Sequence, residues 1–111
     1  MFGDVDHTSH LARNEVFGPV QAVLRFSSED EVLAKANDSP LGLGAYLHTR
    51  DAGRIQLFTR ELECGTVIVN GKGGISPTTP FGGYKQSGFG REGGRAGIEE
   101  MVQRKTVLIA P

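Results

Sequence analysis

The glycines of this chain limit its possible architectures more than any other feature. Sixteen of the 111 residues are glycine, and they crowd between Gly65 and Gly97. Glycine loses more conformational freedom on ordering than any other residue, so this run favours turns over long helices and strands. A long glycine-rich loop in a small domain is usually functional or part of an interface. We therefore expect most regular elements to precede this loop.

The first part of the chain alternates strand and helix patterns. Residues 20–26 (VQAVLRF) are apolar and partly β-branched, which predicts a strand. Ser28 and Glu31 form a capping-box pattern that predicts a helix, and Ser39-Pro40 is expected to end it.

The same alternation continues toward the loop. Residues 43–48 (LGAYLH) predict a second strand, and residues 66–70 (TVIVN) a third. Between them, Asp51 is expected to cap a helix that reaches about Leu62, with Gly65 as its left-handed C-terminal cap.

After the glycine-rich loop, residues 96–102 predict a short helix and residues 105–110 (KTVLIA) a last strand. Residues 1–14 show no clear pattern. The overall alternation predicts an α/β fold with a largely parallel sheet and flanking helices.

Charge and composition narrow the class of protein. With 12 basic and 13 acidic residues spread along the chain, we expect no nucleic-acid or membrane partner, since either needs clustered positive charge. No apolar run approaches the roughly 20 residues of a membrane span, and we expect no secretory signal. The single cysteine, Cys64, cannot form an internal disulfide, so a reducing, cytoplasmic compartment is expected.

Gly88, Gly90 and Gly93 match the GxGxxG pattern of dinucleotide-binding loops. That pattern needs a strand before it and an acidic residue about 20 positions after it. The preceding residues 80–87 (PFGGYKQS) predict no strand, and the chain ends before the acidic position. We expect tight turns that use positive φ angles, and a small nucleotide-binding module is the weakest alternative.

Four blocks carry a family resemblance: EVFGPV (15–20), ANDSPLGLGAYLHTRD (36–51), GTVIVN (65–70) and PFGGYKQSGFGREGG (80–94). In order and spacing they resemble the C-terminal portion of aldehyde dehydrogenases. The resemblance implies that residues 1–104 are part of the catalytic domain and that residues 105–111 are an oligomerisation-arm strand.

The resemblance also implies a reaction. Enzymes of this kind oxidise an aldehyde to a carboxylic acid with NAD or NADP. A cysteine thiolate attacks the aldehyde, a hydride passes to the nicotinamide, and a glutamate activates water to release the acid. Both the nucleophilic cysteine and this glutamate lie upstream of EVFGPV in the family, so no catalytic residue is assigned here.

Three site residues follow from the resemblance. Glu15 matches a glutamate that binds the nicotinamide ribose, and Phe17 an aromatic residue near the nicotinamide ring. Phe81 matches an aromatic residue of the aldehyde tunnel, and residues 71–79 match the loop at its mouth. The alternatives are a solvated carboxylate for Glu15, a core residue for Phe17 and a buried loop anchor for Phe81.

Other polar residues are interpreted as structural. We expect Asn70 to support the turn after its strand, and Lys85, Arg91 and Glu92 to hold the loop by pairing. Cys64 is expected near a helix C-terminus, which disfavours a thiolate. The histidines suggest no metal site.

Two functional hypotheses remain. In the first, the chain is part of an aldehyde dehydrogenase, is inactive alone, and forms a homo-oligomer or associates with a missing N-terminal part. The opening residues MFGDVD resemble the interior of an aldehyde dehydrogenase sequence, so we expect a truncation there. In the second, it is a non-catalytic, self-associating or interaction module, whose uncovered sheet edges promote contact between copies.

Overall fold

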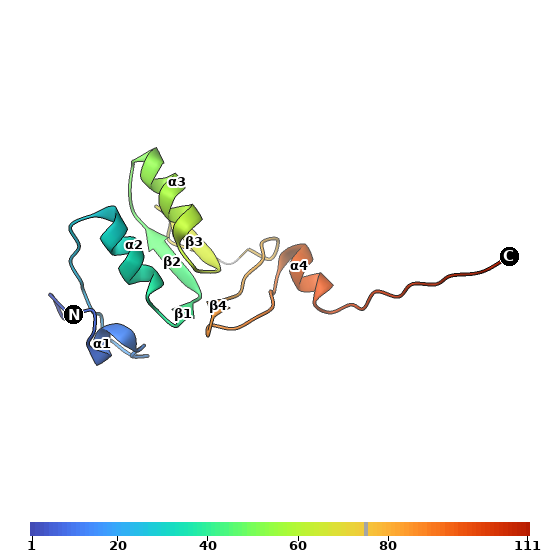
Figure 1. Cartoon of the computed structure of the whole chain (residues 1–111), viewed down its shortest axis with the longest axis horizontal. Coiled ribbons are helices and arrows are strands. Elements are labelled where there is room, and N and C mark those ends of the chain that lie inside the picture. Colours follow the sequence, from blue (N-terminus) through green and yellow to red (C-terminus); the bar gives the residue numbers. More distant parts are fainter. Residues whose placement is uncertain (75) are drawn as a thin grey trace.

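The chain forms a rounded body that continues into a long, thin extension. The computed structural model describes residues 1–74 and 76–111. Its extents are 72 × 32 × 24 Å and its radius of gyration is 18.5 Å, whereas a compact domain of this length has a radius of about 13 Å. In Figure 1 the glycine-rich loop, the last helix and the C-terminal tail lead away from the body.

Four helices are present in the described residues, and two have the predicted caps. They are α1 (His10–Arg13), α2 (Glu29–Asn37), α3 (Ala52–Glu61) and α4 (Gly94–Glu99). The Ser28 hydroxyl accepts a hydrogen bond from the Glu31 amide at the start of α2. Asp51 accepts one from the Arg54 amide at the start of α3. Both predicted helix starts are confirmed.

The strands form two small pairs. β2 (Gly44–Leu47) lies parallel to β3 (Thr66–Val69), and α3 connects them as a β-α-β unit. β1 (Leu41–Gly42) lies antiparallel to β4 (Tyr84–Lys85). The structure thus contains both helices and strands, in agreement with the predicted α/β class. The prediction of one largely parallel sheet is wrong, because β2 and β3 have no further parallel neighbour among the described residues.

Two predicted strands do not form as such. In residues 20–26 only Ala22 makes a bridge, to Phe2. Residues 102–111, including the predicted strand 105–110, are exposed and form no ladder. A strand needs a partner for its amide and carbonyl groups, and the described residues offer the tail none.

The range of the last helix and the role of Gly65 differ from prediction, whereas α3 ends within one residue of the predicted Leu62. The last helix is α4, which begins at Gly94 and ends at Glu99. Helix α3 ends at Glu61, and the extended residue Leu62 follows it. Gly65 lies outside the left-handed region, so its predicted capping role is wrong. A glycine is required there because the backbone of Gly82 passes so close: a Cβ atom at position 65 would lie 1.8 Å from the carbonyl oxygen of Gly82.

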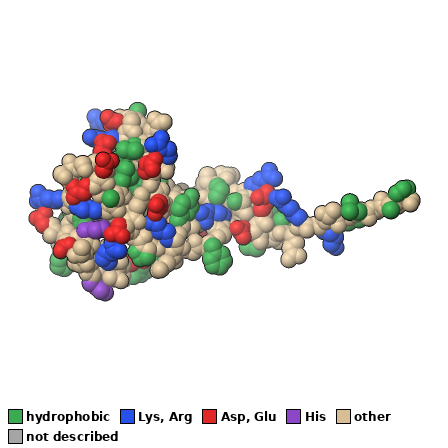
Figure 2. All heavy atoms as spheres, in the orientation of Figure 1, with side chains coloured by type: hydrophobic (Ala, Val, Ile, Leu, Met, Phe, Trp, Pro, Cys, Tyr) green, Lys and Arg blue, Asp and Glu red, His purple; other side chains and the backbone are tan. Residues whose placement is uncertain are grey.

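The interior is small. Phe58 of α3 is the one buried hydrophobic side chain among the described residues, with 8% of its surface exposed. Large apolar side chains are exposed elsewhere, among them Phe17, Phe89 and Ile109. In Figure 2 hydrophobic side chains appear on the surface of the body and along the tail. Much apolar surface is thus left without intramolecular cover.

No helix in the described part of the chain combines the length and the apolar character needed to span a bilayer.

Candidate functional site

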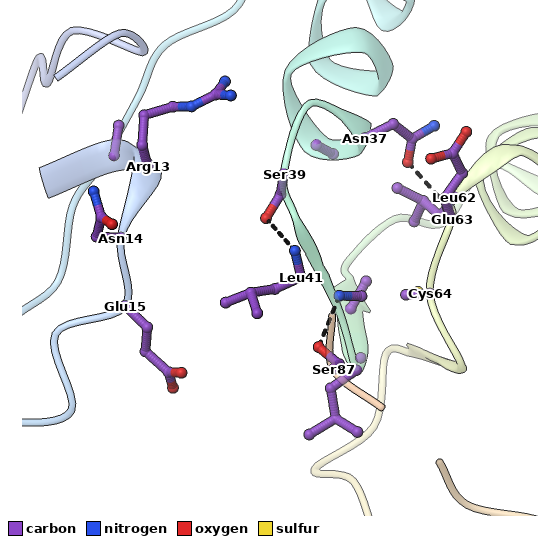
Figure 3. Close-up of a pocket in the computed structure, with 16 residues that line it drawn as sticks. Arg13, Asn14, Glu15, Asn37, Ser39, Leu41, Leu62, Glu63, Cys64 and Ser87 are labelled. Atoms are coloured by element: carbon purple, nitrogen blue, oxygen red, sulfur yellow. Dashed lines mark hydrogen bonds between the residues drawn. The ribbon is translucent and has the colours of Figure 1, made fainter. Parts of the chain in front are cut away.

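Glu15 faces a hollow in the rounded body. Helix α1 is capped by Ser9, and the backbone becomes extended at Asn14, which brings Glu15 to the rim. The hollow has a volume of about 650 Å³ and lies between the ends of α1 and α2, strands β1 and β2, residues 62–64 and Ser87. We call it the Glu15 hollow; Figure 3 shows Glu15 on one side of it, opposite Ser39, Leu41 and Ser87.

Most polar groups around this hollow already have partners. The Ser39 hydroxyl accepts from the Leu41 amide at 3.1 Å, and the Ser87 hydroxyl accepts from the Gly42 amide at 2.9 Å (Figure 3). Asn37 bonds the backbone of Glu61 and Glu63. Within the described residues the carboxylate of Glu15 has no hydrogen-bond partner or ion pair. It is therefore available to a ligand.

Cys64 lines the same hollow but is not activated. Its thiol donates a hydrogen bond to the Thr66 carbonyl oxygen at 3.3 Å. Burial raises the pKa of the Cys64 thiol, which keeps it protonated near neutral pH. Because α3 ends three residues earlier, burial rather than a helix terminus is the cause. The prediction of an unreactive cysteine agrees with this environment.

Phe81 lines a second hollow, of about 510 Å³, which we call the Phe81 hollow. Phe81 is half-buried, and its backbone exchanges two hydrogen bonds with Glu92, at 2.8 and 2.9 Å. Phe81 thus anchors the loop, and its place in an aldehyde tunnel stays a prediction. Residues 72–74 of the predicted mouth loop line the hollow, and Ile75 lies outside the described residues.

The two hollows adjoin. Leu43 and Gly44 line both of them, so the start of β2 forms a shared wall. Glu15 and Phe81 are therefore brought to neighbouring hollows. Phe17 is not: 97% of its surface is exposed and it lines neither hollow. The alternative interpretation of Phe17 as a core residue of this chain is wrong.

The predicted structural pairing is confirmed for Lys85 and Arg91, whereas within the described residues Glu92 holds the loop through backbone bonds to Phe81 and not through its carboxylate. The Lys85 ammonium donates to the carbonyl oxygens of Asn37 (2.6 Å) and Ser39 (3.2 Å). It also pairs with Glu63 at 2.7 Å. These contacts attach β4 to the end of α2, which is one wall of the Glu15 hollow.

The side chains of Arg91 and Asn70 also hold neighbouring segments together through backbone groups. Arg91 donates to the carbonyl oxygens of Gly83 and Gly90 and lies 5.4 Å from the centre of the Tyr84 ring. Asn70 has a positive φ of 53°. Its amide bonds both backbone groups of Thr49, which joins the ends of β2 and β3.

The GxGxxG residues form turns. Gly88, Gly90 and Gly93 have φ angles of 118°, 80° and 75°, as the turn hypothesis expected. The prediction that no strand precedes them is wrong, because β4 lies there. That strand is antiparallel and two residues long, so the arrangement is not the parallel strand and helix of a dinucleotide-binding motif.

The sequence analysis did not single out Tyr46 of the Phe81 hollow, and it included Lys72 only as part of the mouth loop 71–79. Tyr46 could have been found from strand periodicity. Gly44 and Tyr46 lie on one face of β2, and they are in register with Thr66 and Ile68 of β3. All four line the hollow. In the described part of the chain, no three His, Cys, Asp or Glu side chains gather into a metal-binding group.

Comparison with known proteins identifies the family. Residues 1–107 match the model of the aldehyde dehydrogenase family. The chain is 46% identical over 110 residues to the NADP/NAD-dependent aldehyde dehydrogenase PuuC of Escherichia coli K12, covering 99% of this chain and 22% of that protein. It is 48% identical over 109 residues to betaine aldehyde dehydrogenase of Brucella melitensis, covering 98% of this chain and 22% of the relative.

Solved structures agree. A Mycobacterium tuberculosis aldehyde dehydrogenase complexed with NAD⁺ superposes with a TM-score of 0.90 and 39% identity, over 97% of this chain and 22% of that one. Succinate-semialdehyde dehydrogenase from Burkholderia pseudomallei gives 0.82 and 44%, over 86% of this chain and 20% of that one. The chain belongs to the aldehyde dehydrogenase family and spans about a fifth of the length of these relatives.

Proposed function

We propose that this chain is the C-terminal portion of an enzyme that oxidises an aldehyde to a carboxylic acid with NAD⁺ or NADP⁺. In that reaction the aldehyde carbon loses a hydride to the cofactor and gains the oxygen of water. One proton is released as the acid forms, and a second is released when the acid ionises to its carboxylate. When bound, the nicotinamide supplies the hydride acceptor. The residues of this chain contribute binding and positioning.

The observation that carries the proposal is the unpaired carboxylate of Glu15 at a hollow that adjoins the Phe81 hollow. A carboxylate can accept hydrogen bonds from both hydroxyls of a ribose. The other polar groups nearby are occupied by backbone partners, so Glu15 is suited to this task. The aldehyde would lie in the Phe81 hollow, on the other side of Leu43 and Gly44.

The chain by itself is proposed to be inactive. Its single cysteine has a raised pKa and a protonated thiol that donates to the Thr66 carbonyl. A thiol held in this way is poorly suited to act as the thiolate that attacks the aldehyde. A nucleophile and a water-activating base would come from the remainder of the enzyme.

A second candidate function is self-association. Val107, Leu108 and Ile109 lie in the exposed, extended tail, whose backbone groups lack partners among the described residues. A strand of this kind can pair with another chain. Light scattering over a range of concentrations tests this function. A single monomeric mass throughout would count against it.

The test of the main proposal is a segment exchange. Residues 1–110 replace the matching 22% of the E. coli relative, and cofactor reduction is measured with aldehydes and with NAD⁺ or NADP⁺. We expect turnover by the exchanged protein and none by the isolated chain. Glu15→Gln is expected to raise KM for the cofactor about tenfold, as loss of a charge-assisted contact does.

The matched control is Asp30→Asn, which neutralises an exposed carboxylate on α2 away from both hollows. It should leave KM unchanged. An exchanged protein that binds cofactor equally well with Glu15 and with glutamine would contradict the ribose role.

A further inference from the structure

The Phe81 hollow contains a single charged residue. Among its described lining residues, only Lys72 carries a formal charge, and no carboxylate is present. The Lys72 ammonium forms no ion pair or hydrogen bond with the described residues. The hollow therefore has a positive potential that no group in its own wall neutralises.

A hydroxyl group without a partner among the described residues lines the same hollow. Tyr46 is 64% exposed, and its hydroxyl has no hydrogen-bond partner among the described residues. That hydroxyl lies against Gly73, the neighbour of Lys72: a Cβ atom at Gly73 would be 2.9 Å from the oxygen. Gly73 also has a φ of 75°, which disfavours any residue with a side chain. Gly73 thus leaves room for the Tyr46 ring against the backbone of the residue that follows Lys72.

The rest of the lining is largely apolar. Leu43, Ile68, Pro80 and Phe81 contribute hydrocarbon surface. The volume of about 510 Å³ falls in the range of small-molecule sites. The hollow therefore offers a surface for a carbon chain together with one cation and the hydroxyls of Tyr46, Thr66 and Thr79. The Thr79 hydroxyl already donates to the Ser76 carbonyl oxygen.

We propose that the Phe81 hollow selects aldehydes that carry a carboxylate at the end remote from the aldehyde group. Lys72 and Tyr46 donate hydrogen bonds to that carboxylate, and Ile68 and Phe81 contact the intervening carbon chain. This inference rests on the proposed function, because it names the substrate class of the same site.

Charge decides between substrate classes. A single ammonium balances a single carboxylate, and a hydroxyl donor satisfies a further lone pair. A quaternary ammonium aldehyde could use the aromatic rings of Tyr46 and Phe81, but it would meet Lys72 as a like charge. A neutral aldehyde gains from the apolar wall alone. The expected order of preference is anionic, then neutral, then cationic.

The experiment uses the exchanged enzyme with three probes: succinate semialdehyde, butanal of equal carbon number, and betaine aldehyde. We expect Lys72→Ala to lower the ratio of kcat/KM for succinate semialdehyde over butanal about tenfold, through KM. Lys72→Arg should keep the preference, and Lys72→Glu should move it toward betaine aldehyde. Higher ionic strength should weaken the preference, since the contact is partly exposed.

The control variant is Lys105→Ala, which removes an exposed lysine from the tail and should leave the ratio unchanged. An unchanged ratio in both Lys72→Ala and Lys72→Glu would overturn the inference while the proposed function stands. If the exchanged enzyme reduces cofactor with none of the probes, the proposed function fails. In that case the binding of a carboxylate to the Phe81 hollow is measured directly.

That separate measurement is an NMR titration of the purified chain with butyrate and with butyramide. We expect saturable shifts at Lys72 and Gly73 with butyrate and none with butyramide. Lys72→Ala should abolish the butyrate shifts, and Tyr46→Phe should weaken them. Absence of any shift that depends on Lys72 would overturn the inference.

Discussion

The ammonium of Lys85 lies 2.7 Å from the carboxylate of Glu63, across the junction between β4 and the segment after α3. The same ammonium donates to the carbonyl oxygens of Asn37 and Ser39. One side chain therefore joins three segments around the Glu15 hollow. Together with the β1–β4 ladder and the bond from the Gly42 amide to the Ser87 hydroxyl, it attaches the middle of the glycine-rich loop to the rounded body.

Replacing Lys85 by methionine should destabilise the chain by about 2 kcal/mol, because charge-assisted hydrogen bonds to two carbonyl oxygens are lost. Urea unfolding followed by circular dichroism measures this change. The control is Lys105→Met, at an exposed tail position, which should be neutral. Equal midpoints for the two variants would show that the Lys85 contacts contribute nothing to stability.

Gly65→Ala should be more damaging. The added methyl would lie 1.8 Å from the Gly82 carbonyl oxygen, so two backbone segments must separate. We expect a loss of about 3 kcal/mol, at the upper end of overpacking effects. Gly3→Ala places a methyl in open space and serves as the control. Thermal unfolding of both variants, compared with the parent chain, tests the difference.

Glu31 makes the stability of α2 dependent on pH. The Lys35 ammonium, then the hydroxyl and amide of Ser27, lower the pKa of Glu31 from its ordinary 4.5 to about 2. The folded form thus favours the ionised carboxylate. Its contribution is complete above pH 4.5 and is lost as the pH falls toward 2. The carboxyl carbon of Glu31, followed by NMR, should titrate near 2.

The control for that titration is Lys35→Met, which removes the largest cause of the lowered pKa. The midpoint of Glu31 should then move upward, toward its ordinary value. A Glu31 midpoint near 4.5 in the unaltered chain would contradict the ion pair and the bonds to Ser27.

Cys64 should react slowly with thiol reagents. Burial raises its pKa, so less thiolate is present at mildly alkaline pH than for a free cysteine. Alkylation followed by mass spectrometry gives the rate in buffer and in concentrated urea. We expect a clearly faster reaction in urea, where the thiol is solvated. A rate in buffer at or above that in urea would mean that the thiol is activated.

The local elements could be predicted because their causes are local. Ser28 and Asp51 cap the first turns of their helices through groups three residues away, and the β-branched run 66–69 suits a strand. No element can be predicted within residues 1–14, because the four residues of α1 are too few to show a helical periodicity.

What could not be predicted depends on partners far away in the chain. Whether residues 20–26 or 105–110 form strands depends on a neighbouring strand, which their own sequence does not specify. The side-chain carboxylate of Glu31 accepts from the amide and hydroxyl of Ser27 and not, as a capping box requires, from the amide of the cap residue Ser28. Tyr46 and Lys72 meet at one hollow only through the register of β2 and β3 and the turn at Gly73.

The parallel pairing of β2 and β3 has a consequence for the order of folding. Each residue of β2 pairs with a residue 22 positions later, and α3 fills the interval. Closing a loop of this length carries a modest entropic penalty. Residues 44–69 contain the whole of this β-α-β unit, so its pairing needs none of the residues that follow Val69 in the chain. The unit can therefore act as a template, against which the glycine-rich segment settles afterwards through Gly65 and Lys85.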